Sequence, residues 1–149
     1  MYTYSIFSVK PKIAIHYFCK TGILFRFLQE VEEHPNDSLL QLQYEYIINP
    51  LSFSNIMSIL KRIDNDIEIE KRDQYLKLYW QGKQITIYQD NGHLKISSED
   101  IDDVEEFLFP ALRKSPEYYF AINNRLEDYG WLSVKNNRIV DNQILYPLH

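Results

Sequence analysis

The amino-acid sequence predicts an α+β protein, in which a mostly antiparallel sheet is packed by about five helices. The sheet combines an N-terminal strand, a central meander and a C-terminal strand. Between residues 12 and 60 apolar side chains recur at helical spacings of three and four, whereas from residue 67 they alternate with polar ones. A chain of 149 residues without a linker or an internal repeat predicts a single domain over residues 1–149.

The chain begins with a predicted strand at residues 2–9, which are rich in Tyr, Thr, Ile, Phe and Val. Lys10-Pro11 ends it, because proline suits the first turn of a helix. Residues 12–33 are predicted to be helical, in two pieces that break near Thr21-Gly22. The second piece has an apolar stripe at spacings of four and three, which predicts a core-facing side: Leu24, Leu28 and Val31.

Two further helices are predicted after the polar loop at residues 34–37. The first covers residues 38–49, with Asp37 or Ser38 as its cap and Pro50 as its end. Ser52 is suited to cap the second helix, which is short. Its apolar residues are Phe53, Ile56, Ile59 and Leu60.

The central meander is predicted from three strands and one clear turn. Residues 75–80 and 85–88 form strands joined around Gly82, and a third strand follows at residues 93–97. Asn91-Gly92 lies between the second and third strands and is the strongest turn signal in the chain, because both residues tolerate positive φ. These segments therefore predict antiparallel hairpins.

An acidic helix and a last strand complete the predicted fold. Ser97 or Ser98 caps the helix, and Pro110 kinks or ends it. A strand follows at residues 118–122, and Gly130 is expected to permit a tight turn that lets its aromatic neighbours pack. One more turn is predicted at Asn136-Asn137.

Composition limits the classes of partner. The formal net charge of −5, without any basic cluster, argues against direct nucleic-acid binding, since Lys71-Arg72 is flanked by acids. A lone cysteine, Cys19, excludes an intrachain disulfide and fits a reducing compartment. No apolar run approaches the ~18 residues of a membrane span, and no signal peptide is recognisable. We therefore expect a cytoplasmic protein.

Candidate catalytic groups are few. His16 and Cys19 lie three residues apart on one predicted helix and could form a nucleophilic pair in a small hydrolase or transferase, although such pairs normally come from separate elements. The carboxylates of residues 99–106 fit the first turns of a helix, where negative charge is favourable. No metal-ligand spacing and no phosphate-binding glycine loop is present. We expect no enzymatic activity, no metal and no cofactor.

Two predicted helices carry more apolar surface than one core-facing stripe requires. The helix at 38–49 has apolar or aromatic residues on nearly every side, and the helix at 12–20 has Ile13 and Tyr17 on one side with Ile15 and Phe18 elsewhere. Either these helices lie at the centre of the domain, or they present a second surface to a partner. The sequence leaves both explanations open.

Five short segments, in their order along the chain, resemble the sporulation inhibitor of replication (SirA) family. The segments are Tyr2-Thr3-Tyr4, His16-Tyr17-Phe18, Gln43-Tyr44-Glu45-Tyr46-Ile47-Ile48-Asn49-Pro50, Phe120-Ala121 and Tyr129-Gly130-Trp131-Leu132. The similarity extends over nearly the whole chain at low identity. The order and spacing of the whole set carry the resemblance.

The resemblance implies a small, cytosolic, non-enzymatic inhibitor of DNA replication initiation that binds domain I of the initiator DnaA through its N-terminal helices. The implied contact positions are Ile13, Tyr17 and Gln43, and the neighbouring His16 and Tyr46 complete the predicted partner-binding set. A regulator that binds a different protein is the main alternative.

This sequence departs from the family pattern at three places. Ile13 stands where a phenylalanine is expected, so Tyr17 or Phe18 would have to supply the aromatic contact. The loop at Lys10-Pro11 is a residue or two longer, and Glu127-Asp128 stands where basic residues are expected.

Overall fold

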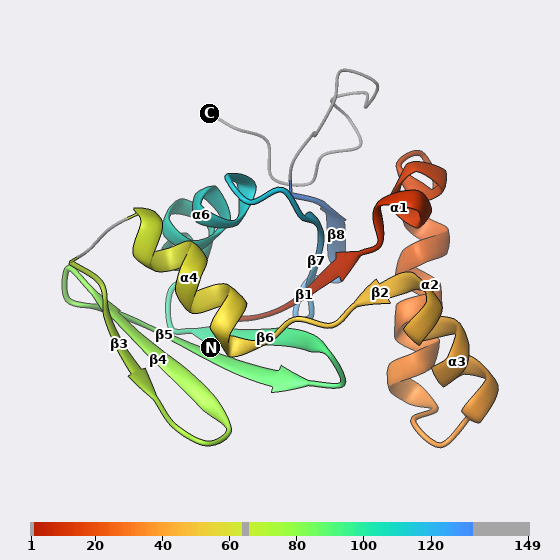
Figure 1. Cartoon of the computed structure of the whole chain (residues 1–149), viewed down its shortest axis with the longest axis horizontal. Helices are drawn as coiled ribbons and strands as arrows, with labels where there is room; N and C mark the ends of the chain where they lie inside the picture. Colours follow the sequence, from red (N-terminus) through yellow and green to blue (C-terminus); the bar gives the residue numbers. More distant parts are fainter. Residues whose placement is uncertain (1, 64–65, 133–149) are drawn as a thin grey trace.

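The computed structural model describes residues 2–63 and 66–132 and contains a curved antiparallel sheet (Figure 1). Its strands are β1 (Tyr2–Val9), β2 (Ile48–Asn49), β3 (Glu68–Lys71), β4 (Tyr75–Trp80), β5 (Lys83–Asp90), β6 (His93–Ser98), β7 (Tyr118–Asn123) and β8 (Asp128–Trp131). The strand order is β3-β4-β5-β6-β1-β7-β8, and β2 pairs with the end of β1. The sheet therefore joins the first strand of the chain to the last described one through β7.

Helical residues in the described part of the chain fall into five stretches. Four are single α-helices: α1 (Pro11–Tyr17), α2 (Thr21–Glu33), α3 (Ser38–Ile47) and α4 (Phe53–Ile63). The fifth runs without interruption through α5 (Ile101–Asp103), the π-helical segment η1 (Val104–Leu108) and α6 (Phe109–Arg113). The predicted α+β class, with its N-terminal strand, meander and C-terminal strand, is confirmed.

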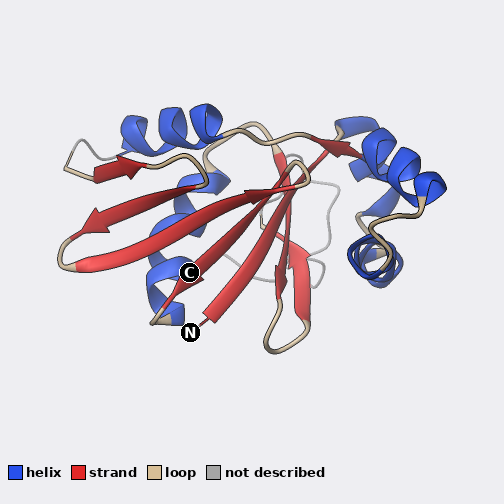
Figure 2. Cartoon of the chain, turned by 90° about the horizontal axis from the view of Figure 1, so that it is seen from below, coloured by secondary structure: helices blue, strands red, loops and turns tan. Residues whose placement is uncertain are grey.

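The two faces of the sheet contribute to two separate cores, and β1 takes part in both. Alternate side chains of β1 point to opposite faces, so Tyr4 and Ile6 join one core whereas Phe7 and Val9 join the other. The first core lies under α4 and the α5–α6 stretch, and the second lies under α1, α2 and α3. Seen from below, the strands lie between these two groups of helices (Figure 2).

Both hairpin turns of the meander have the backbone that their sequences predict. Asn91 and Gly92 have φ values of 49° and 76°, and Gln81 and Gly82 have 47° and 77°. Two successive residues with positive φ form the turn that matches the twist of antiparallel strands. The Asn91-Gly92 prediction is therefore confirmed, and Gly82 does occupy the turn between β4 and β5.

The predicted helix over residues 38–49 is too long by two residues. It begins as expected, because the Asp37 carboxylate accepts hydrogen bonds from the backbone N–H groups of Leu39 and Leu40. It ends at Ile47, since Ile48 and Asn49 form β2 opposite Val9 and Ser8. Pro50 contributes by disfavouring helical backbone at the residue before it.

The acidic helix begins later than predicted, and Pro110 does not end it. Ser98 lies in β6, and the Asp100 side chain accepts from the Asp102 N–H, so Asp100 occupies the cap position. Pro110 is the second residue of α6, directly after the π-helical segment, where the hydrogen-bond spacing of the helix changes from five residues to four.

Gly130 does not form a turn. It lies inside β8 opposite Ala121, between Tyr129 and Trp131, whose side chains both point to the second core. The break between α1 and α2 falls where it was predicted. The predicted turn at Asn136-Asn137 lies outside the described residues.

The first core gives a direct test of this architecture. Leu60 of α4 is fully buried in it, so Leu60→Ala should lower the free energy of unfolding by about 2–5 kcal/mol. Leu126, in the turn between β7 and β8, is 57% exposed, and Leu126→Ala should change that free energy by no more than about 0.5 kcal/mol. Denaturant unfolding of both variants measures the difference, and equal costs would contradict the placement of α4.

Candidate partner-binding surface

Helices α1, α2 and α3 lie side by side at one end of the molecule (Figure 1). Their side chains form a shallow, mostly apolar groove. Its volume is about 500 Å³. It is lined by Ile13 and Tyr17 of α1, Ile23 and Phe27 of α2, and Leu42, Gln43, Tyr46 and Ile47 of α3. None of the lining side chains carries a formal charge, so apolar contact and the Gln43 amide dominate its chemistry.

The groove exists because each helix buries one side in the second core and presents a neighbouring side to solvent. Helix α2 buries the predicted stripe of Leu24, Leu28 and Val31. Ile23 and Phe27, one position earlier in each turn, form a second stripe at a spacing of four, which runs beside the first. Helix α1 does the same with Ala14 buried and Ile13 and Tyr17 beside it.

Helix α3 accounts for most of the exposed apolar surface. Leu39, Leu42 and Tyr46 are 65%, 63% and 69% exposed, whereas its buried residues are Tyr44 and Ile47. Ile15 of α1 and Ile23 of α2 are also exposed, at 56% and 49%. Contiguous exposed apolar residues are typical of interaction sites. The core therefore buries only part of the apolar surface of these helices, and the rest is exposed to solvent.

One basic side chain borders the groove. The Lys10 ammonium group lies 5.9 Å from the centre of the Tyr46 ring and donates a 2.8 Å hydrogen bond to the carbonyl oxygen of Glu45. A cation at this distance over a tyrosine ring is electrostatically favourable. Lys10 thereby holds the exposed Tyr46 ring from the α1 side.

The structure brings together four of the five predicted partner-binding residues. Ile13, Tyr17, Gln43 and Tyr46 all line the groove. His16 lies on α1 but is exposed and does not line it. Sequence reasoning missed four lining residues, although the spacing of four between two of them was a usable signal: Ile23, Phe27, Leu42 and Ile47.

The alternative catalytic groups are not assembled into a site. Cys19 is exposed and lies beyond the end of α1, so it does not share a helix with His16. Within residues 2–63 and 66–132, no hydrogen bond orients the His16 ring, and no group of three metal-ligating side chains occurs. In the same part of the chain, no helix has the length and hydropathy needed to cross a bilayer.

The acidic residues near α5 have structural partners. The Asp103 carboxylate lies 3.1 Å from the Lys83 ammonium group, and Glu105 accepts a 2.8 Å hydrogen bond from the Tyr4 hydroxyl. Asp100 caps the helix, as described above. These three carboxylates therefore contact different neighbours.

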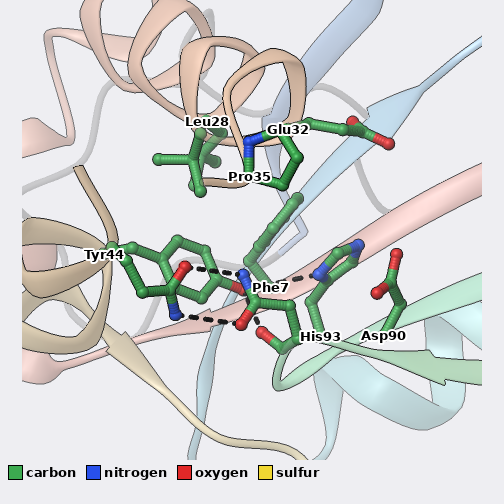
Figure 3. Close-up of a pocket in the computed structure, with 10 residues that line it drawn as sticks. Phe7, Leu28, Glu32, Pro35, Tyr44, Asp90 and His93 are labelled. Carbon is green, nitrogen blue, oxygen red and sulfur yellow. Dashed lines mark hydrogen bonds between the residues drawn. The ribbon is translucent and has the colours of Figure 1, made fainter. Parts of the chain in front are cut away.

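A second, smaller pocket of about 340 Å³ lies on the other side of α3, between α2 and the hairpin at Asn91 (Figure 3). The His93 ring forms part of it and stacks on Phe7, with ring centres 4.4 Å apart. The Tyr44 hydroxyl donates a 2.7 Å hydrogen bond to the Asn91 carbonyl. His93 Nδ1 lies 3.4 Å from the same oxygen.

Burial of the His93 ring lowers its pKa to about 4, against an ordinary value of 6.5. Lys95 lowers the pKa further, whereas Asp90 and Glu32 raise it, and burial dominates because the side chain is nearly enclosed. Burial also raises the pKa of the neighbouring Tyr44 hydroxyl. Both rings are therefore neutral near pH 7 and act as uncharged hydrogen-bonding groups behind α3.

This lowered pKa predicts a loss of stability in acid. Between pH 6.5 and 4 the unfolded chain binds a proton at His93 that the folded chain does not, so the free energy of unfolding should fall by up to about 3 kcal/mol as the pH drops through that range. His93→Phe keeps an aromatic ring on Phe7 and cannot titrate. Chemical denaturation from pH 7 to 4 should give a flatter profile for His93→Phe, and parallel profiles would refute the assignment.

Comparison with known proteins identifies the family. The family described as "Sporulation inhibitor of replication protein SirA" matches residues 2–136. The sporulation inhibitor of replication protein SirA of Bacillus subtilis (strain 168) is 22% identical over 141 residues, which covers 91% of this chain and 95% of that protein. Both matches extend over the sheet, over both groups of helices and over the groove. The chain therefore belongs to the SirA family.

Proposed function

We propose that this protein inhibits the initiation of DNA replication by binding domain I of the initiator DnaA through the groove between α1, α2 and α3. The observation that carries the proposal is a coincidence of two independent sets of residues. Ile13, Tyr17 and Gln43 are the positions that the family resemblance implies for DnaA contact, and the same three line the exposed apolar groove.

The shape and chemistry of the groove favour a helical partner segment. An amphipathic helix that docks into an apolar groove inserts side chains spaced three and four residues apart. The groove offers apolar walls from three helices and a single amide, Gln43, for orientation. The missing phenylalanine at position 13 is offset by the aromatic rings of Tyr17, Phe27 and Tyr46 around the same depression.

The charge of the chain supports a protein partner over direct contact with origin DNA. A formal net charge of −5 repels the phosphate backbone, and the groove itself has no cationic lining residue. Inhibition is therefore proposed to act on the initiator protein. A different protein partner would use the same apolar residues, so only a binding measurement with DnaA separates these two candidates.

The first test is complex formation. We expect the full chain, mixed with DnaA domain I from the same organism, to form a 1:1 complex that sedimentation or light scattering detects. Full-length DnaA should bind equally well, and DnaA lacking domain I should not bind. Absence of any complex with the organism's own DnaA would refute the proposal and leave a different partner as the candidate.

The second test locates the interface. Tyr17→Ala and Tyr46→Ala should each weaken binding by about 1–2 kcal/mol, because aromatic side chains at the centre of an interface carry much of its free energy. Tyr46 is 69% exposed in the free protein, so its truncation should leave the fold intact. Leu126→Ala, which removes an exposed apolar side chain far from the groove in sequence, is the matched control and should bind as the wild type does.

A further inference from the structure

Helix α3 contributes four residues to the groove but buries only two of its side chains. Leu42, Gln43, Tyr46 and Ile47 line the groove, and of these only Ile47 is buried; Tyr44 is the other buried residue of the helix. The position of a helix with two buried side chains depends strongly on each of them. Tyr44 is therefore a candidate for a residue that sets the geometry of the partner surface without lining it.

Tyr44 and Gln41 attach α3 to the hairpin between β5 and β6 (Figure 3). The Tyr44 hydroxyl donates to the Asn91 carbonyl oxygen at 2.7 Å. The side-chain amides of Gln41 and Asn91 exchange two hydrogen bonds, at 3.0 and 3.2 Å. We call these three residues, Gln41, Tyr44 and Asn91, the α3 anchor.

The hairpin is a rigid support for this attachment. Its two turn residues, Asn91 and Gly92, have the paired positive φ values of a tight turn. The Gly92 carbonyl accepts a 2.9 Å hydrogen bond from the N–H of Leu51, and the Gln89 side-chain amide donates to the Leu51 carbonyl, also at 2.9 Å. The turn is thus bonded on one side to the segment after β2 and on the other to α3.

We propose that Gln41 and Tyr44 are positioning residues for partner binding: by bonding to the Asn91 turn, they fix α3 so that Gln43 and Tyr46 meet the partner in one geometry. This inference rests on the proposed function only for the identity of the partner. If the anchor is broken, α3 samples other positions, and the apparent affinity falls in proportion to the fraction of molecules that remain competent to bind.

The test compares two buried tyrosines. Tyr44→Phe removes the hydroxyl of the anchor and keeps the ring. Tyr119→Phe removes a hydroxyl of the first core, which donates to Ser115 Oγ at 3.3 Å and lies on the other face of the sheet. Loss of one hydrogen bond predicts a weakening of DnaA domain I binding by about three- to tenfold for Tyr44→Phe, and no change for Tyr119→Phe.

A double-mutant cycle separates positioning from a general loss of stability. If Tyr44 acts through the residues that α3 presents, Tyr44→Phe should cost little further affinity in a Tyr46→Ala, Gln43→Ala background. In an Ile13→Ala background, Tyr44→Phe should weaken binding by the same factor as in the wild type, because Ile13 belongs to α1. Equal costs in both backgrounds would overturn the proposal.

Amide hydrogen exchange in the free protein makes the anchor testable without any partner. Tyr44→Phe and Gln41→Ala should each speed exchange in α3 while exchange in α4 stays unchanged. If the wild type fails to bind DnaA but exchange in α3 rises, the proposed function fails and the anchor stands. If exchange in α3 and the affinity both stay at wild-type values in the two variants, the anchor is wrong.

Discussion

Strand β1 is the constraint on which the rest of the structure depends. Its two edges are paired with β6 and β2 on one side and β7 on the other, and both of its faces are buried. Its side chains must therefore satisfy two cores at once, with Tyr4 and Ile6 in one and Phe7 and Val9 in the other. Its small polar residues fit this position, since Ser8 bonds to the Glu117 carboxylate across the neighbouring strand. The core beneath α1, α2 and α3 lies on the Phe7 face.

The strands and turns could be predicted because their signals are local. The Asn91-Gly92 turn is recognised from two adjacent residues that accept positive φ. In the same way, the buried side of α2 is recognised from the helical spacing of Leu24, Leu28 and Val31. Strand β2 could not be predicted, because two residues are too short to show a period, and Ile48 and Asn49 become a strand only by pairing with residues about forty positions earlier. The predicted turn at Gly130 was wrong for a related reason, because Gly130 lies inside β8 and pairs there with Ala121.

The candidate surface was predictable in part. Ile13, Tyr17, Gln43 and Tyr46 came from a resemblance and from helices with too much apolar character, and both signals are present in the sequence. Which of the apolar residues would be exposed was not predictable, because it depends on how three helices pack against one another. Ile23 and Phe27 face the groove only because Leu24 and Leu28 are buried against the sheet. The hydrogen bond between Tyr44 and Asn91 could not be predicted either, because it joins segments about fifty residues apart.

Tyr129 and Trp131 do not line the groove, yet they support the helices that do. The Tyr129 ring stacks on Phe25 of α2 at 4.2 Å, and Trp131 packs edge-on against Phe18 after α1. The segment around Gly130, which helps to identify the family, thus supports the groove, whereas Tyr17, Gln43 and Tyr46 lie in other family segments and line it. A substitution at Tyr129 or Trp131 would therefore alter the groove indirectly, through the packing of Phe25 and Phe18, without removing any side chain that lines it.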